Sequence, residues 1–342
     1  MRWAACWMQY PLRFAGVLLS TVFLLINCED NPPLPLPEMS IHLHDRQVLR
    51  NYSTSFSAYS QTHINESEIN YFWDFGDGIV QSGQQVSHTF TELDSYYVSL
   101  TVSNQSETRD IGRWVRVSPS LELIASYPLG IESPSGLSFG LDKLSLWTVS
   151  DKPGGTVSEI DHQGNLVRNI PYYGTDLEGV CFDERDSSLW VIDEGTAELI
   201  HLDTNGVVLH KQWIAGVSDG GGLEGIAVNP VDDRIFLLKE KDNSALIVLG
   251  DSLSVKQYSR IGFASDYSGL SYSTTRGLLW MLSHENSSLY LTDSSGALLA
   301  EYGFRMEQAE GLAVDEEASL FYIVDDTLEE LRVYSFWDQA EL

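Results

Sequence analysis

The chain has 342 residues, of which 43% are hydrophobic and 20% are charged, so it is long enough for two or more packed domains and too apolar for extended disorder. Its 49 acidic residues outnumber 20 lysines and arginines and give a formal net charge of −29, which argues against a DNA- or RNA-binding role. Three scattered cysteines are too few for a disulfide framework or a cysteine-rich zinc site.

Residues 1–27 are typical of a secretory signal. Arg2 and Arg13 precede an apolar run over residues 14–26 that contains no acidic residue and is too short to span a bilayer comfortably. The run ends in Leu25-Ile26-Asn27-Cys28, which resembles a bacterial lipobox, although Asn27 stands where a smaller residue is usual. The resemblance implies acylation at Cys28 and a protein anchored in the cell envelope, at the outer membrane, the cell surface or the outer face of the plasma membrane. A simple signal peptide or an uncleaved anchor is the alternative.

Residues 28–38 contain four prolines and no apolar periodicity. Proline-rich segments of this kind adopt extended conformations and act as spacers. We therefore expect a tether that holds the folded part of the chain away from the membrane.

Residues 39–118 have the pattern of a small antiparallel sandwich, with alternating strands such as 97–102 and 114–117. The string Trp73-Asp74-Phe75-Gly76-Asp77-Gly78 and the downstream His88-Thr89-Phe90 resemble the PKD domain family. The resemblance implies an Ig-like β-sandwich that serves as a spacer or binds proteins or glycans, and we expect the spacer role. From their place around a turn, Asp74 and Asp77 are expected to accept backbone hydrogen bonds rather than to hold a metal.

Residues 119–342 contain one unit repeated five times. Each unit has a glycine between Ser or Glu and an aliphatic residue, and an aromatic residue follows eleven positions later. The glycines are Gly136, Gly179, Gly225, Gly269 and Gly311, at successive spacings of 43, 46, 44 and 42 residues. The aromatic residues are Trp147, Trp190, Phe236, Trp280 and Tyr322. This spacing is the length of a four-stranded propeller blade.

The fifth unit lacks its last strand, and the segment 121–127 can supply it by pairing with the run 331–334. Such closure removes an exposed sheet edge. We therefore predict an all-β chain with a five-bladed β-propeller, or six blades if residues 119–134 form more than one strand. The strings 176–180, 222–226 and 310–315 resemble the SdiA-regulated domain family of bacterial envelope propellers, for which the resemblance implies no established activity.

The repeat places two positions of each hairpin at one mouth of the propeller. The first position holds Ser135, Glu178, Glu224, Ser268 and Glu310. The second holds Ser150-Asp151, Asp193-Glu194, Lys239-Glu240, Ser283-His284 and Asp325-Asp326. Carboxylates this close need a counter-charge, which Lys239 or a hard divalent cation could provide. The candidate ligands of such a cation, Ca²⁺ in first place, are Glu178, Glu224, Glu310, Asp193 and Asp325. The first interpretation of these acids is structural: they hydrogen-bond neighbouring backbone amides and hold adjacent blades in register. A metal site comes second, and a direct ligand-binding or catalytic role is the third.

Lys239 and His284 break the repeat, and they are the weak candidates for a catalytic role. A metal-dependent hydrolase of the lactonase or phytase-like phosphoesterase kind is the alternative function, with His284 as its base. That alternative also calls for neutral amide ligands near the axis, and none occurs at the repeated positions. The leading expectation is a binding module for a protein, glycan or cation, with no catalytic residue assigned.

Overall fold

The computed structural model describes residues 35–61, 69–214, 222–250 and 252–337. The predicted signal peptide, Cys28 and most of the predicted tether lie outside these residues. No helix in the described part of the chain is long and apolar enough to cross a membrane.

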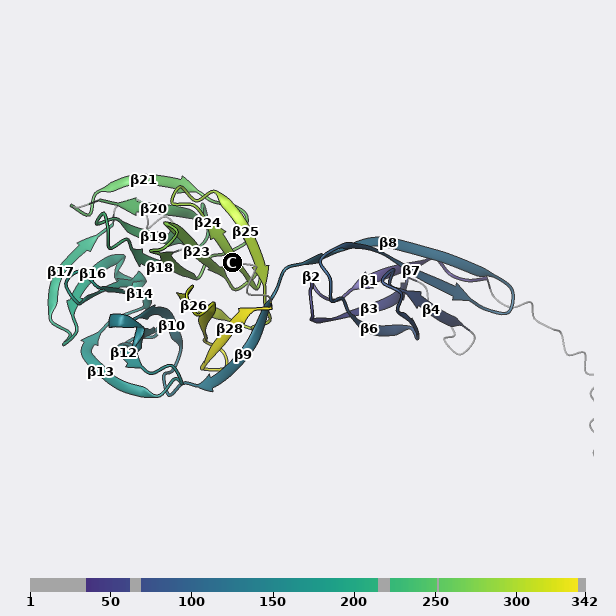
Figure 1. The fold of residues 1–342 in the computed structure, drawn as a ribbon, viewed down its shortest axis with the longest axis horizontal. Coiled ribbons are helices and arrows are strands. Elements are labelled where there is room, and N and C mark those ends of the chain that lie inside the picture. Colours follow the sequence, from purple (N-terminus) through teal and green to yellow (C-terminus); the bar gives the residue numbers. More distant parts are fainter. Residues whose placement is uncertain (1–34, 62–68, 215–221, 251, 338–342) are drawn as a thin grey trace, which may run out of the picture.

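The N-terminal unit is a sandwich of two antiparallel-rich sheets, which lies beside the propeller (Figure 1). One sheet has the order β1-β3-β6 and the other the order β2-β8-β7-β4-β5. The strands are β1 (Met39–Leu43), β2 (Val48–Leu49), β3 (Ser53–Ser60), β4 (Asn70–Asp74), β5 (Val80–Ser82), β6 (Gln85–Thr89), β7 (Ser95–Ser103) and β8 (Thr108–Ser118).

The aromatic side chains of residues 72–75 lie either in the core or at the surface of the sandwich, as the alternation of side chains along a strand requires. Trp73 and Phe75 are fully buried and pack with Phe56 and Phe90, whereas Phe72 is 46% exposed. Leu36, which the sequence assigns to the tether, is also buried in this core. Burial of these rings, together with the aliphatic residues packed around them, stabilises the sandwich.

The two aspartates of the string hold its turn. Asp74 Oδ1 accepts from the backbone amide of Gly76 at 2.9 Å, and Asp77 Oδ1 accepts from that of Ile79 at 3.1 Å. Asp77 Oδ2 also lies 2.7 Å from Nε2 of the buried His88. The expected structural role of Asp74 and Asp77 is therefore confirmed.

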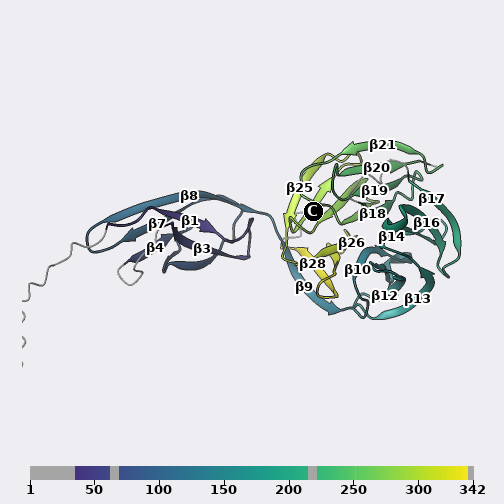
Figure 2. The ribbon, with the colours of Figure 1, turned by 180° about the vertical axis from the view of Figure 1, so that it is seen from behind.

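Residues 121–336 form a β-propeller, as predicted, in which the described residues give five four-stranded sheets around one axis (Figures 1 and 2). From the axis outward, the first sheet holds β10 (Pro134–Phe139), β11 (Leu146–Ser150), β12 (Thr156–Ile160) and β13 (Leu166–Tyr173). The second holds β14 (Leu177–Asp183), β15 (Ser188–Asp193), β16 (Glu198–Asp203) and β17 (Val208–Trp213). The third holds β18 (Leu223–Val228), β19 (Ile235–Lys239), β20 (Ala245–Leu249) and β21 (Val255–Arg260).

The fourth sheet holds β22 (Gly269–Ser273), β23 (Leu278–Ser283), β24 (Ser288–Thr292) and β25 (Leu298–Gly303). The fifth holds β26 (Ala309–Asp315), β27 (Leu320–Asp325), β28 (Glu330–Phe336) and, as its outer strand, β9 (Leu121–Pro128). Two short 3₁₀ turns, η2 (Leu141–Lys143) and η3 (Glu194–Thr196), lie in loops.

The ring closes in the way the repeat predicts. β9 pairs antiparallel with β28, from Leu121 opposite Phe336 to Pro128 opposite Glu330. The first strand of every sheet contacts the first strands of both neighbouring sheets, including β10 with β26. The segment before the first repeat therefore completes the last sheet and leaves no open edge at this seam.

The repeated glycine has a packing reason. A Cβ at Gly136 would lie 2.5 Å from the carbonyl oxygen of Glu178, and a Cβ at Gly179 would lie 2.6 Å from that of Glu224. A Cβ at Gly311 would lie 2.6 Å from the backbone of Gly136. Real Cβ atoms do not come this close to backbone, so any larger residue forces neighbouring first strands apart.

We expect Gly179→Ala to lower the free energy of unfolding by about 1–3 kcal/mol, because the added methyl group overpacks the axis against backbone atoms. Gly262→Ala is the matched control: its Cβ would have nothing within 4 Å, and its effect is expected to lie between zero and a gain of about 1 kcal/mol. Urea unfolding of the two variants checks this. Equal midpoints for both variants would contradict the packing argument.

Candidate functional site

The first and second strands of each sheet meet at the predicted mouth. Leu177 pairs with Asp193, Leu223 with Lys239 and Ala309 with Asp325, so the start of each first strand lies opposite the end of the second. The two residue positions named by the repeat therefore share one end of the propeller.

A β-bulge sets the direction of the glutamate side chains at the mouth. In four of the five sheets the pairing of the first and second strands shifts at the Ser-Gly or Glu-Gly step, and the shifts lie at Ser135/Leu137, Leu177/Val180, Leu223/Gly225 and Ala309/Gly311. A bulge leaves one residue unpaired and redirects its side chain. Glu178, Glu224 and Glu310 have no register partner and lie at these shifts.

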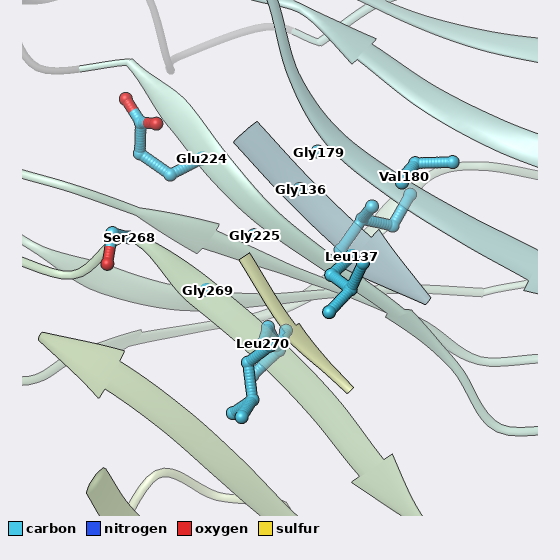
Figure 3. A pocket seen from close by; sticks show the side chains of 11 residues that line it. Gly136, Leu137, Gly179, Val180, Glu224, Gly225, Ser268, Gly269 and Leu270 are labelled. Carbon is cyan, nitrogen blue, oxygen red and sulfur yellow. The ribbon is translucent and has the colours of Figure 1, made fainter. Parts of the chain in front are cut away.

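A small cavity lies on the axis. It is lined by the glycines and aliphatic residues of the first strands, with the side chains of Glu224 and Ser268 on one side, at the left in Figure 3. Its volume has room for about one water molecule. This cavity is therefore too small for an organic ligand.

Five carboxyl groups gather on the first three sheets, in two groups that share one residue. One group consists of Asp151, Asp176 and Glu178, and the other of Glu178, Glu194 and Glu224. Within each group, one oxygen of each carboxyl lies within 4.8 Å of the others. This is a spacing at which carboxylate oxygens could surround one cation.

Burial and mutual repulsion raise the pKa values of these carboxyls. Burial, followed by the charge of Asp151, raises the pKa of Glu178 to about 8, although Ser135 Oγ donates to its Oε2 at 2.9 Å. Burial and the charge of Glu178 raise the pKa of Glu224 well above its usual value. Burial and a hydrogen bond with Asp176 raise the pKa of Asp151 to about 7. The group therefore holds protons near neutral pH unless a cation replaces them.

Sequence reasoning named Glu178 and Glu224, which the structure brings together, and it assigned Asp151 and Glu194 to the mouth without choosing them as ligands. It missed Asp176. The signal was present: Asp176 lies two residues before Glu178, and strand alternation brings such residues to the same side. Among the described residues, Glu310 joins neither group, and burial raises its pKa to about 7 although Gln308 and His284 oppose the shift.

Asp193 and Asp325, proposed from the sequence as metal ligands, are placed outside both carboxyl groups of the described residues. Asp193 accepts from the backbone amide of Thr175 at 3.0 Å and from its hydroxyl at 2.5 Å. Asp325 accepts from the amide of Leu328 at 3.0 Å, with Arg332 Nη2 at 3.6 Å. Asp325 thus stabilises the loop that follows it, whereas Asp193 holds the end of β15 against the loop between β13 and β14.

Lys239 and His284 have specific partners at the mouth. Lys239, 2% exposed, donates to the carbonyl oxygens of Lys241 at 3.1 Å and Asp242 at 3.0 Å. His284 Nδ1 lies 3.1 Å from Oδ2 of the fully buried Asp266, and this bond raises the pKa of His284. Burial alone would raise the pKa of Asp266, but its bonds with His284 and Ser283 bring it below its usual value. Asp266 was missed by sequence analysis, although it lies two residues before Ser268 just as Asp176 precedes Glu178.

The fold and site define a β-propeller with an acidic mouth, preceded by an Ig-like sandwich. The SdiA-regulated family profile matches residues 122–328, and the PKD domain profile matches residues 36–117. The chain belongs to the SdiA-regulated family and carries an N-terminal PKD domain, as its sequence resemblance implies.

Solved structures with similar folds are distant in sequence. A chain of a nidogen/laminin complex has 9% identity and a TM-score of 0.43, over 75% of this chain and 85% of that one. A streptogramin B lyase has 9% identity and a TM-score of 0.40, over 87% and 98%. An auxiliary nutrient binding protein from Bacteroides thetaiotaomicron has 9% identity and a TM-score of 0.40, over 89% and 98%. At this similarity nothing about activity follows for this chain.

The raised pKa of Glu178 gives stability a defined pH dependence. Between the ordinary value of 4.5 and about 8, the folded chain holds a proton on Glu178 that the unfolded chain has released. The free energy of unfolding therefore falls as pH rises through this window, by at most about 1.4 kcal/mol per pH unit for this group.

We expect Glu178→Gln to match the wild type at pH 4.5 and to melt at a higher temperature by pH 8, in EDTA. Glu184→Gln, which removes an exposed acid at the opposite end of the same sheet, is the control and should follow the wild type throughout. Melting curves at several pH values check this, and a parallel pH dependence in all three chains would refute it.

Proposed function

We propose that the protein is a binding module of the bacterial envelope, and that its propeller mouth binds a cation between the carboxyl groups of β14 and β18. The observation that carries this is the position of Glu178. It belongs to both carboxyl groups, it is 7% exposed, and its pKa is raised to about 8. A cation that replaces the bound proton there would relieve repulsion in both groups at once.

Oxygen-only ligands favour a hard divalent cation, and Ca²⁺ is the first candidate because it accepts irregular sets of carboxylates. The closed axis supports binding at the mouth, since the cavity below it holds about one water molecule. A bound cation could itself serve as the contact point for an anionic group on a protein or glycan partner. The sandwich then serves as the spacer or adhesion unit that holds this mouth at a distance from the anchor.

The test is the melting temperature of the chain in excess EDTA and then in Ca²⁺, Mg²⁺ or Mn²⁺. At a concentration one hundred times the dissociation constant, a cation bound only to the folded chain raises the melting temperature by roughly 5–10 °C. The double variant Glu178→Gln/Glu224→Gln is expected to lose this rise, while Glu184→Gln keeps it. A rise that survives in the double variant, or none with any cation, would refute the site.

We also propose that Cys28 is acylated and anchors the protein in the envelope. The support is the apolar run that ends at Cys28 and the proline-rich segment that follows it. Metabolic labelling with palmitate in a bacterial host is expected to label the full chain but not the Cys28→Ser variant. The variant should also be lost from the membrane fraction. Equal labelling of both would overturn the proposal.

A further inference from the structure

The sandwich and the propeller meet along a defined set of contacts. In Figure 1 the β2 end of the sandwich faces the propeller rim near β25 and β9. The sandwich segment 44–52, which contains β2, supplies the contacts, and it joins parts of the propeller more than two hundred residues away in sequence.

Arg46 reaches a loop of the mouth. Its Nη1 donates to the carbonyl oxygen of Glu285, in the loop 284–287 between β23 and β24. This loop carries His284, and the amide of Glu285 donates to Asp266 Oδ1 at 3.1 Å. The sandwich thus contacts the loop that presents the His284 and Asp266 pair.

Asp45 reaches the neighbouring mouth loop. Its Oδ1 lies 3.2 Å from Nη2 of Arg305, in the loop 304–308 between β25 and β26. The amide of Phe304 donates to the carbonyl oxygen of Ser287 at 3.0 Å, so the two loops are bonded to each other. Gln308, in the same loop, bonds Glu310. Contacts from the sandwich therefore reach two loops of the mouth near Glu310.

The contacts beside these two residues fix the direction in which they point. Gln47 Nε2 donates to Glu301 Oε1 at 3.1 Å, and Leu49, 2% exposed, packs against Gly303. Tyr52 OH donates to the carbonyl oxygen of Leu121 at 2.8 Å, and the buried Ser120 Oγ donates to that of Arg50 at 2.6 Å. Hydrogen bonds and an apolar contact therefore hold the segment 44–52 against the propeller at several points.

We propose that Arg46 and Asp45 are positioning residues of the propeller mouth, so that the sandwich is a working part of the binding site and not only a spacer. The inference rests on the proposed function only in taking the mouth as the binding site. The first three sheets supply carboxyl groups, and the sandwich holds the other half of the mouth, which carries His284, Asp266 and Glu310.

The experiment is hydrogen exchange of the full chain in EDTA, followed by mass spectrometry of peptides that cover the mouth loops. Arg46→Ala is expected to speed exchange in residues 284–288 about fivefold, the effect of losing one ordinary hydrogen bond, and to leave the loop 151–155 on the far side of the mouth unchanged. Asp45→Asn is expected to do the same for residues 304–308.

Arg46→Lys, whose ammonium can also donate to the Glu285 carbonyl, should restore much of the protection. Arg116→Ala, an exposed arginine of β8, is the matched control.

A second readout is the titration of the His284 imidazole by NMR. Its pKa, raised in the wild type by Asp266, is expected to fall toward the usual histidine value in Arg46→Ala and to stay raised in Arg116→Ala. The proposal is overturned if protection of residues 284–288 is the same in Arg46→Ala and wild type, or if Arg116→Ala or Arg46→Lys lowers it equally. A wild type that binds no cation would refute the proposed function alone, because neither readout uses one.

Discussion

The closeness of the first strands at the propeller axis is the constraint on which the rest of the site depends. Backbone of one first strand lies where a Cβ of the next would stand, as at Gly136 and Gly179, so the residue at this point has to be glycine. The same closeness reduces the axial space to about one water molecule. The bulge beside the glycine then turns the preceding side chain toward the mouth, because inward there is no room for it. Packing at the axis therefore leaves little space there and places the preceding side chains at the mouth.

The mouth is chemically divided although the backbone around it repeats. The first three sheets carry the five clustered carboxyl groups, which repel one another, and burial and this repulsion raise the pKa of Glu178 to about 8. On the fourth sheet the repeated position is Ser268, whose hydroxyl donates to the carbonyl oxygen of Ala309 in the fifth sheet at 2.6 Å. There His284 carries a buried aspartate partner and lies near the rim contacted by the sandwich. The two halves of the mouth therefore differ in chemistry: clustered carboxyl groups lie on one side and a histidine paired with a buried aspartate on the other.

The sequence was sufficient for features that depend on local spacing. Glycines at regular intervals and aromatics at a fixed offset predicted the hairpins of the propeller, and the surplus segment 121–127 predicted its closure. Asp74 and Asp77 were assigned correctly because an aspartate bonds amides two residues ahead whatever surrounds it. The roles of Asp193 and Asp325 depend on loop conformations that spacing does not specify, and their carboxyls accept from the amides of Thr175 and Leu328. The contact of Arg46 with Glu285 joins residues 239 positions apart, and no local pattern in either segment predicts it.

Closure of the ring also fixes an order of events in folding. Ser126 of β9 bonds Glu330 of β28, 204 positions later, so the outer strand of the fifth sheet leaves the ribosome long before its partner. Until β28 has been made, β9 has no partner strand in its sheet. The chain between the two strands is nearly the whole propeller, and a loop of this length must close before they can pair. Contacts this distant in sequence form slowly and leave strand edges open to other chains in the meantime. The pairing of β9 with β28 closes the ring, and it is therefore the folding step before which the growing chain is most open to pairing with a wrong strand.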